Sequence, residues 1–187
     1  MVIALSKKVA QRLSWACRQR RYWARPASLN GLPVDIHDEV QSALHARKPV
    51  VALESTLITH GLPSPHATEL PIDCERILRE QDVVPATIAI LNGRIKVGLD
   101  TSDLAELAHK GHAARRADYA GRKLWKVGRR EIAAAVVSRV DGGTTVSATS
   151  AIAHIAGIKI FAYGRNWGCA QGSRDDFRHF ERPHLVG

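Results

Sequence analysis

Glu54 is the residue whose position best suits acid–base chemistry, because it lies in a short apolar segment rich in β-branched residues. This segment, residues 49–55, is typical of a strand buried on both faces. Open α/β sheets bind ligands at the carboxyl ends of such strands, and burial there raises a carboxyl pKa into the range of a general acid. The alternative is a capped or salt-bridged glutamate at the start of a loop.

Two further segments carry groups that suit an anion. Gly142-Gly143-Thr144-Thr145 precedes a helix of small residues, so its backbone N–H groups and hydroxyls are placed to hold a phosphate. A plain turn with a helix cap is the alternative.

Lys126 is the centre of a basic group that also includes Arg129 and Arg130. These three cations suit a clamp for an anion, and the solvated start of a helix is the alternative.

The histidines and cysteines give no sign of a metal centre. His60 and His66 flank a proline-rich loop without an acid or a cysteine at ligand spacing, so we interpret them as structural. Cys17, Cys74 and Cys169 are an odd number without zinc-site spacing, which also argues against a disulfide framework.

The elements that must position these residues alternate between strands and helices, which predicts an α/β fold that includes an antiparallel ribbon. Asn92-Gly93 is a strong signal for the tight turn of that ribbon, since both positions favour positive φ. Residues 113–123 are basic and poor in apolar side chains, so we expect an exposed loop there. The expected strands are residues 49–55, 86–91, 94–99 and 158–162, and the expected helices are residues 67–81, 102–108, 129–140 and 147–156.

Composition limits the classes of protein to consider. The 187 residues are 45% apolar, which is enough for one domain of medium size with a hydrophobic core. The formal net charge is +9, but seven of the 27 basic residues precede the first acid, Asp35, so the remaining 20 basic and 18 acidic residues nearly balance. We therefore expect no nucleic-acid partner. No apolar run approaches the roughly 20 residues of a membrane-spanning helix, so we expect no membrane association.

Residues 1–33 have the pattern of a mitochondrial transit peptide. The segment is rich in arginine, contains no acid, and places its apolar residues along one side of a helix opposite basic ones. Arg20-Arg21-Tyr22 resembles a cleavage context for a matrix protease. We therefore expect a mitochondrial protein, and a disordered basic arm on a cytoplasmic protein is the alternative.

Several blocks of the sequence, in order, resemble the amino-terminal half of the pseudouridine-5′-phosphate glycosidase family, also called the indigoidine synthase A-like family. The blocks are VALESTLITHGLPSP, VPATIAILNGRIKVGL, KVGRRE and GGTTVSATSAIAHIAGIKIFA, and they span residues 49–162. The resemblance implies an α/β/α fold with a mixed sheet and flanking helices, in a homotrimer. It also implies a manganese-dependent enzyme that reversibly splits pseudouridine 5′-phosphate, a phosphosugar nucleotide, into uracil and ribose 5-phosphate.

The resemblance also assigns roles to individual residues. Glu54 matches the proton donor, Lys126 matches a substrate-binding lysine, and Val146 matches a substrate contact beside Thr144 and Thr145 in the phosphate-binding region. The family uses a further lysine, which forms a Schiff base with the opened sugar. A C-glycosidic bond has no basic leaving oxygen, which explains why no second carboxylate is needed.

The sequence departs from the family pattern after Ala162. The family continues with TGGIGGVHRG and a block whose aspartate binds the metal, whereas this chain continues YGRNWGCAQG. When the last two bases of each codon are joined to the first base of the next, permitted codons give GIGGVHRGAETTFDISSDL. We therefore interpret residues 163–187 as an out-of-frame tail produced by one extra base, and a divergent terminus is the alternative.

This interpretation divides the chain into residues 1–33, a leader, residues 34–162, half of a glycosidase domain, and residues 163–187, the tail. The metal-binding aspartate is then not encoded, and the nucleophilic lysine is expected beyond Gly187. We accordingly expect a truncated family member with impaired activity. The alternatives are a non-catalytic phosphosugar-binding fragment and, less favoured, a basic nucleic-acid-binding protein.

Overall fold

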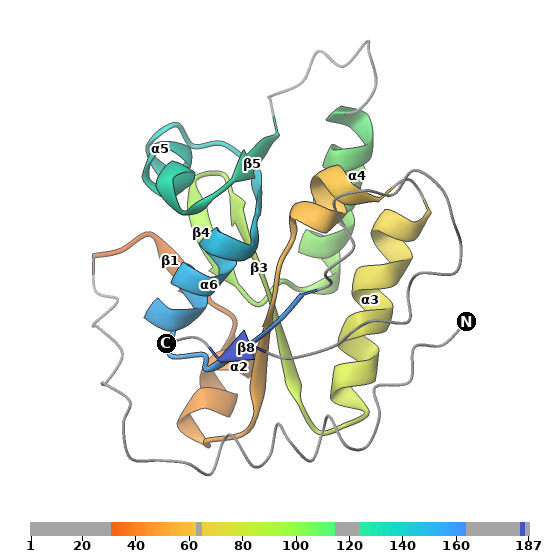
Figure 1. Ribbon diagram of the computed structural model, residues 1–187, viewed down its shortest axis with the longest axis vertical. Coiled ribbons are helices and arrows are strands. Elements are labelled where there is room, and N and C mark those ends of the chain that lie inside the picture. The colour runs from red at the N-terminus through yellow and green to blue at the C-terminus, as the bar shows by residue number, and fades with distance from the viewer. Residues whose placement is uncertain (1–30, 63–64, 115–123, 164–183, 186–187) are drawn as a thin grey trace.

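The computed structural model describes residues 31–62, 65–114, 124–163 and 184–185 (Figure 1). Helices and strands alternate along most of the described chain. The strands are β1 (Val34–Ile36), β2 (Val50–Leu53), β3 (Val84–Leu91), β4 (Arg94–Val97), β5 (Trp125–Val127), β6 (Gly142–Thr144), β7 (Ile160–Ala162) and β8 (His184–Leu185). The α-helices are α2 (Asp38–His45), α3 (His66–Arg79), α4 (Thr101–Ala114), α5 (Ile132–Val137) and α6 (Val146–Ile155), with a π-helix, η1 (Leu57–Gly61), and a 3₁₀ turn, η2 (Arg129–Glu131).

The strands form one mixed sheet around β3, in the order β1-β4-β3-β2-β7-β8. β2 is parallel to β3 and to β7, whereas β4 is antiparallel to β3. β5 and β6 lie off this path, with β6 paired to both β3 and β5. The predicted α/β class with a mixed sheet and flanking helices is confirmed.

β2 and β6 share one edge of β3 and run toward each other along it. β2 pairs with the first half of β3, ending with Leu53 opposite Thr87, and β6 pairs antiparallel with the second half, with Gly143 opposite Ala89. The carboxyl ends of the two strands therefore meet beside Ile88. We call this place the β2–β6 junction.

Helices cover both faces of the sheet. Alternate residues of β3 point to opposite faces, so Ile88 and Ile90 pack in one apolar cluster with residues of α2, α5 and α6, while Ala89 and Leu91 pack in another with α4. A third cluster joins Leu78 of α3 to the sheet. α3 and α4 lie side by side (Figure 1). The architecture therefore has three layers, helices on each side of a sheet.

The ribbon predicted around Asn92-Gly93 is confirmed. β3 and β4 pair antiparallel, and the two turn residues have φ of 49° and 74°. The helix expected over residues 102–108 begins one residue earlier, at Thr101, and Asp100 caps it. A carboxylate oxygen of Asp100 accepts hydrogen bonds from the Asp103 N–H and the Ser102 hydroxyl, both at 2.7 Å, and the helix runs on to Ala114. Residues 113 and 114 of the predicted loop are therefore helical, and residues 115–123 lie outside the described part.

Two other local predictions were wrong. The helix expected over residues 129–140 begins as a 3₁₀ turn and ends at Val137. Gly142-Gly143-Thr144 is a buried strand rather than a turn, because β3 and β5 supply pairing partners that sequence patterns do not reveal. A side chain at Gly143 would collide with the hydroxyl of Thr59, so only glycine fits there.

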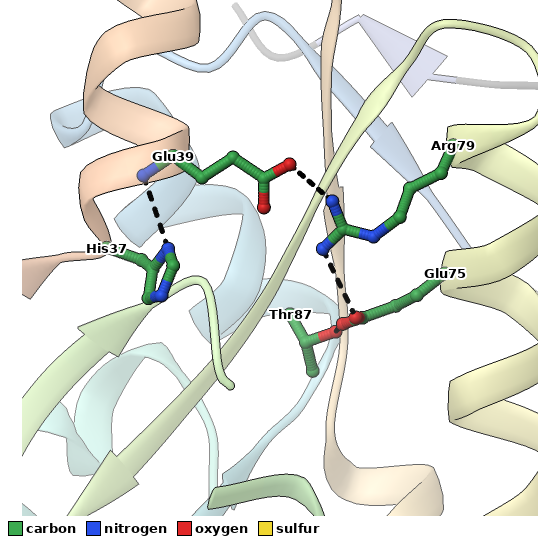
Figure 2. Close-up of polar contacts among 5 residues, drawn as sticks. All are labelled: His37, Glu39, Glu75, Arg79 and Thr87. Atoms are coloured by element: carbon green, nitrogen blue, oxygen red, sulfur yellow. Dashed lines mark hydrogen bonds and ion pairs between the residues drawn. The ribbon is translucent and has the colours of Figure 1, made fainter. Parts of the chain in front are cut away.

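A polar group ties α3 to β3 and α2 (Figure 2). The buried carboxylate of Glu75 accepts a 2.6 Å hydrogen bond from Thr87 on β3, and lies 3.9 Å from the guanidinium of Arg79. Arg79 also pairs with Glu39 on α2, whose backbone N–H donates to the ring of His37 at 3.3 Å. Burial raises the pKa of Glu75, against the opposing effects of Thr87 and Arg79.

Within the ranges described above, no helix is both long enough and apolar enough to cross a membrane.

Candidate active site

Glu54 directly follows β2 and lies at the β2–β6 junction. Its side chain is partly buried, and this burial raises its pKa to about 7. The positive charge of Lys126 acts in the opposite direction and lowers the pKa, but by less. A carboxyl group with this pKa is part protonated at neutral pH, which is the condition for a general acid.

Lys126 lies close enough to Glu54 to affect its pKa, because β5 pairs with β6 at the β2–β6 junction. It lies in β5 opposite Gly143 of β6, and its side chain is exposed. Sequence analysis placed this lysine in a basic group that either clamps an anion or begins a helix, and the structure places it in a strand. Arg129 and Arg130 follow in the 3₁₀ turn and are exposed.

Thr144 ends β6 and is fully buried. Its hydroxyl donates a 2.6 Å hydrogen bond to the carbonyl oxygen of Ile88, and its backbone N–H donates to the Ser55 hydroxyl oxygen at 2.9 Å. The Ser55 hydroxyl donates to the same Ile88 oxygen, also at 2.6 Å. The side chain of Thr144 therefore faces the interior, which differs from the expected direct role in substrate binding.

Thr145 and Val146 form the amino-terminal end of α6. Thr145 caps the helix in extended conformation without a capping bond from its side chain, and its N–H donates to the carbonyl of Val127 at 2.9 Å. Its hydroxyl lies 3.1 Å from that of Ser147, which in turn accepts the N–H of Arg129 at 3.2 Å. Val146 is 40% exposed. Backbone donors and hydroxyls thus gather at a helix end, an arrangement that favours an anion.

The structure brings the five predicted site residues to one place. Glu54 and Lys126 interact electrostatically, Thr144 is joined to the residue after Glu54, and Thr145 and Val146 continue from Thr144 into α6. All of them depend on the pairing of β2, β5 and β6 around β3.

The two histidines lie apart from any cluster of metal ligands. His60 is in the π-helix, with its Nδ1 2.7 Å from the Thr59 hydroxyl, and His66 begins α3 beside Glu69. Among the residues that the structure describes, no three or more His, Cys, Asp or Glu side chains are grouped to hold a metal ion.

Sequence reasoning missed Ser55 and Thr149. Both are fully buried hydroxyl residues, and Thr149 donates to the Thr144 hydroxyl at 2.9 Å. Ser55 directly follows Glu54, but a serine beside a glutamate is too common a feature to single it out, and no local pattern marks Thr149.

The sequence profile of the family described as "Indigoidine synthase A like protein" matches residues 39–177. The chain belongs to this family. The match to the indigoidine synthase A-like family thus extends from the second residue of α2 through β7 and includes the whole β2–β6 junction.

The similarity extends to relatives with a named activity. A pseudouridine-5′-phosphate glycosidase of Clostridium botulinum (strain Langeland) is 41% identical over 144 residues, which are 77% of this chain and 44% of that protein. This family member spans about half the length of the relatives it matches.

Two solved structures share the fold. An indigoidine synthase A-like protein from Thermotoga maritima has a TM-score of 0.57 and 31% identity, covering 70% of this chain and 39% of that one. The prealnumycin C-glycosynthase AlnA, solved in complex with ribulose 5-phosphate, has a TM-score of 0.55 and 35% identity, covering 70% and 38%. These two structures support the three-layered α/β/α assignment.

Proposed function

We propose that this chain provides the acid and the phosphosugar-binding end of a pseudouridine-5′-phosphate glycosidase site. The reaction consumes water and converts pseudouridine 5′-phosphate into uracil and ribose 5-phosphate, and it is reversible. The observation that carries the proposal is the position of Glu54, a carboxyl with a pKa of about 7 at the β2–β6 junction, beside Lys126.

Glu54 is the proton donor in this proposal. Its burial keeps part of the population protonated near neutral pH, so the side chain can protonate the base that leaves and accept a proton in the reverse direction. Lys126 binds an anionic group of the substrate in this proposal. Its side chain is exposed to a ligand and is also close enough to Glu54 to lower the pKa of that carboxyl.

The amino-terminal end of α6 is the proposed phosphate subsite. Thr145 and Ser147 contribute hydroxyls there, and Val146 exposes part of its side chain toward solvent. Free N–H groups and the helix dipole favour a phosphate at such an end. The phosphosugar bound to AlnA, a relative in structure, supports a phosphosugar as the ligand class.

Manganese is the metal that the family resemblance implies, but the described residues do not fit a site for it. Among them, no three or more His, Cys, Asp or Glu side chains are grouped to hold a metal ion. The aspartate expected to bind the metal belongs to residues 163–187, most of which lie outside the described ranges.

The resemblance places the nucleophilic lysine beyond Gly187. The roles proposed for the described residues are therefore proton transfer by Glu54 and phosphosugar binding by Lys126 and the amino-terminal end of α6. The expected homotrimer, the mitochondrial location and the division into residues 1–33, 34–162 and 163–187 remain predictions.

Binding of ribose 5-phosphate to the 187-residue chain tests the proposal, with isothermal titration calorimetry as the measurement. We expect saturable binding that Lys126→Ala weakens by about tenfold or more, because one charge-assisted contact to an anion is lost. Lys159→Ala is the matched control, since Lys159 is an exposed lysine far along the chain from the site. Absence of binding, or equal loss in both variants, would contradict the proposed function.

A non-catalytic phosphosugar-binding fragment is the second candidate. It is favoured by the presence of the helix end and Lys126 in the described fold, together with the expectation that the nucleophilic lysine lies beyond Gly187. Binding of ribose 5-phosphate without release of uracil from pseudouridine 5′-phosphate distinguishes this candidate from the enzyme.

A further inference from the structure

Three buried hydroxyl side chains meet at the β2–β6 junction. Ser55, Thr144 and Thr149 each have no exposed surface, and together we call them the hydroxyl cluster. Ser55 lies two residues after the end of β2, Thr144 ends β6, and Thr149 lies in α6. The cluster contains no charged group, so its effect on the site must be one of geometry.

The hydrogen bonds of the cluster form a complete set. The carbonyl oxygen of Ile88 accepts two, from Ser55 and from Thr144, both at 2.6 Å. The Ser55 oxygen also accepts the N–H of Thr144 at 2.9 Å, and the Thr144 hydroxyl oxygen accepts from Thr149 at 2.9 Å. Each hydroxyl donates its one proton and two of them also accept, so the buried groups are satisfied.

The position of Ile88 explains why side chains supply these bonds. Thr87 is the last residue of β3 opposite β2, and Ala89 is the first opposite β6. Ile88 thus faces the gap where the two strands meet end to end. A buried carbonyl left without a partner there is costly, and the two hydroxyls bridge the gap that the backbone ladders leave.

Two proposed site residues are direct chain neighbours of the cluster. Glu54 precedes Ser55, and Thr145 follows Thr144. Because a peptide unit is rigid and allows only two soft dihedral angles per residue, fixing Ser55 and Thr144 on one carbonyl restricts the residues next to them. The carboxyl group and the amino-terminal end of α6 therefore share a single anchor.

We propose that Ser55 and Thr144 are positioning residues, which set the spacing between the proton donor Glu54 and the phosphate subsite at α6. This inference rests on the proposed function for the meaning of that spacing. Thr144 acts through Glu54 and Thr145 and does not touch the ligand, in agreement with its complete burial.

Two substitutions of Thr144 distinguish the effect of its hydroxyl group from the effect of its size. Thr144→Val keeps the size of the side chain and removes the donor to Ile88, whereas Thr144→Ser keeps the hydroxyl and removes a methyl group. Thr87→Val is the matched control, since Thr87 is equally buried and adjacent to Ile88 on β3, but its hydroxyl donates to Glu75 instead.

The first readout is the titration of the Glu54 carboxyl, followed by carbon-13 NMR and assigned with Glu54→Gln. We expect Thr144→Val to lower the Glu54 pKa from about 7 toward its ordinary value, because a loosened junction admits water. Thr144→Ser should titrate like the unsubstituted chain. Thr87→Val should lower stability in urea by a similar amount to Thr144→Val and leave the Glu54 titration unchanged.

The second readout is the dissociation constant of ribose 5-phosphate. Thr144→Val should raise it about tenfold, as expected for the loss of one buried hydrogen-bond partner, and Thr144→Ser should restore it. If Thr144→Val does not fold, Thr149→Val is the milder variant, because it leaves both donors to Ile88 in place. It should shift the Glu54 titration in the same direction.

The two readouts keep this inference apart from the proposed function. If the unsubstituted chain does not bind ribose 5-phosphate, the proposed function fails, and the Glu54 titration still decides whether the cluster positions that carboxyl. A titration that is unchanged in the folded hydroxyl-free variant would overturn the inference. So would a shift of the same size in Thr87→Val.

Discussion

The hydroxyl of Thr87 on β3 donates a hydrogen bond of 2.6 Å to the buried carboxylate of Glu75 on α3 (Figure 2). We expect Thr87→Val to lower the free energy of unfolding by about 1–3 kcal/mol, because the carboxylate oxygen then lacks its buried donor. Urea unfolding followed by circular dichroism measures the loss. Thr68→Val, an exposed threonine of α3, is the control and should change stability much less.

Glu75→Gln should stabilise the protein at neutral pH. Burial is the largest effect on Glu75 and raises its pKa, so the folded state binds a proton more tightly than the unfolded state. The stability that this group contributes is therefore present at pH below its unfolded pKa and is lost as the pH rises through its folded pKa. The glutamine variant does not undergo this loss. It should therefore be more stable than the unsubstituted chain at neutral pH, and the difference in stability should vanish in acid. An equal advantage at pH 4 and pH 7 would contradict the argument.

Glu54→Gln should also stabilise the protein, and for this residue the pH range of the effect is defined. The folded pKa is about 7, raised from 4.5, so the native state loses stability as the pH rises between these values. The glutamine variant should be more stable than the unsubstituted chain at pH 8 by on the order of 3 kcal/mol, and about equal to it at pH 4. Thermal unfolding across this range checks the prediction. Binding of ribose 5-phosphate should change little, since the amide keeps the shape of the side chain.

Gly143→Ala should lower the free energy of unfolding by introducing a steric clash at the β2–β6 junction. A Cβ there would collide with the Thr59 hydroxyl and lie 2.9 Å from the carbonyl oxygen of Ser55, and neither neighbour is at the end of a flexible side chain. We expect a loss of about 1–3 kcal/mol. Gly61→Ala is the control, because its Cβ meets only the end of the Leu57 side chain. Similar losses in both variants would show that the close approach at Gly143 is unimportant.

The sequence was informative wherever one element sufficed to define the structure. Asn92-Gly93 predicted its turn because both residues adopt positive φ, and the helical spacing of apolar residues predicted α3 and α6 closely. The apolar, β-branched run before Glu54 correctly predicted that this residue lies at the end of a strand. These features depend on a few consecutive residues, so local patterns were enough.

The junction itself could not be predicted in this way. Gly142-Gly143-Thr144 has little intrinsic preference for a strand, and it is one only because β3 and β5 lie on either side. The bonds from Ser55 and Thr144 to Ile88 join residues that are 33 and 56 positions apart in the chain. Contacts of this kind follow from tertiary packing, and single-sequence patterns do not encode them visibly.

The interpretation of residues 163–187 has a direct test at the level of the transcript. Sequencing across the Ala162 codon should show one base more than the family pattern requires. Expression of a version without that base should give the GIGGVHRG block and, if the gene continues in frame, manganese-dependent release of uracil. The 187-residue chain should release none above background. Turnover by this chain would contradict both the tail interpretation and the role assigned to a lysine outside the described residues.

The leader prediction is tested by fusing residues 1–33 to a fluorescent protein. We expect the fusion to co-localise with mitochondria, and we expect neutral substitutions at Arg18, Arg20, Arg21 and Arg25 to abolish this, because import depends on a positive amphipathic helix. A diffuse cytosolic signal from the unsubstituted fusion would contradict the prediction.

The meeting of β2 and β6 on β3 also bears on which changes of chain length this domain tolerates. The position of Lys126 is set by the pairing of β5 with β6, and not by the number of residues between α4 and β5. We therefore expect insertions between α4 and β5 to change the positions of Glu54 and of the amino-terminal end of α6 very little. A single-residue insertion within β3, by contrast, would turn every later side chain to the opposite face and separate the two halves of the site. The distance between the acid and the helix end is therefore tied to the number of residues along β3.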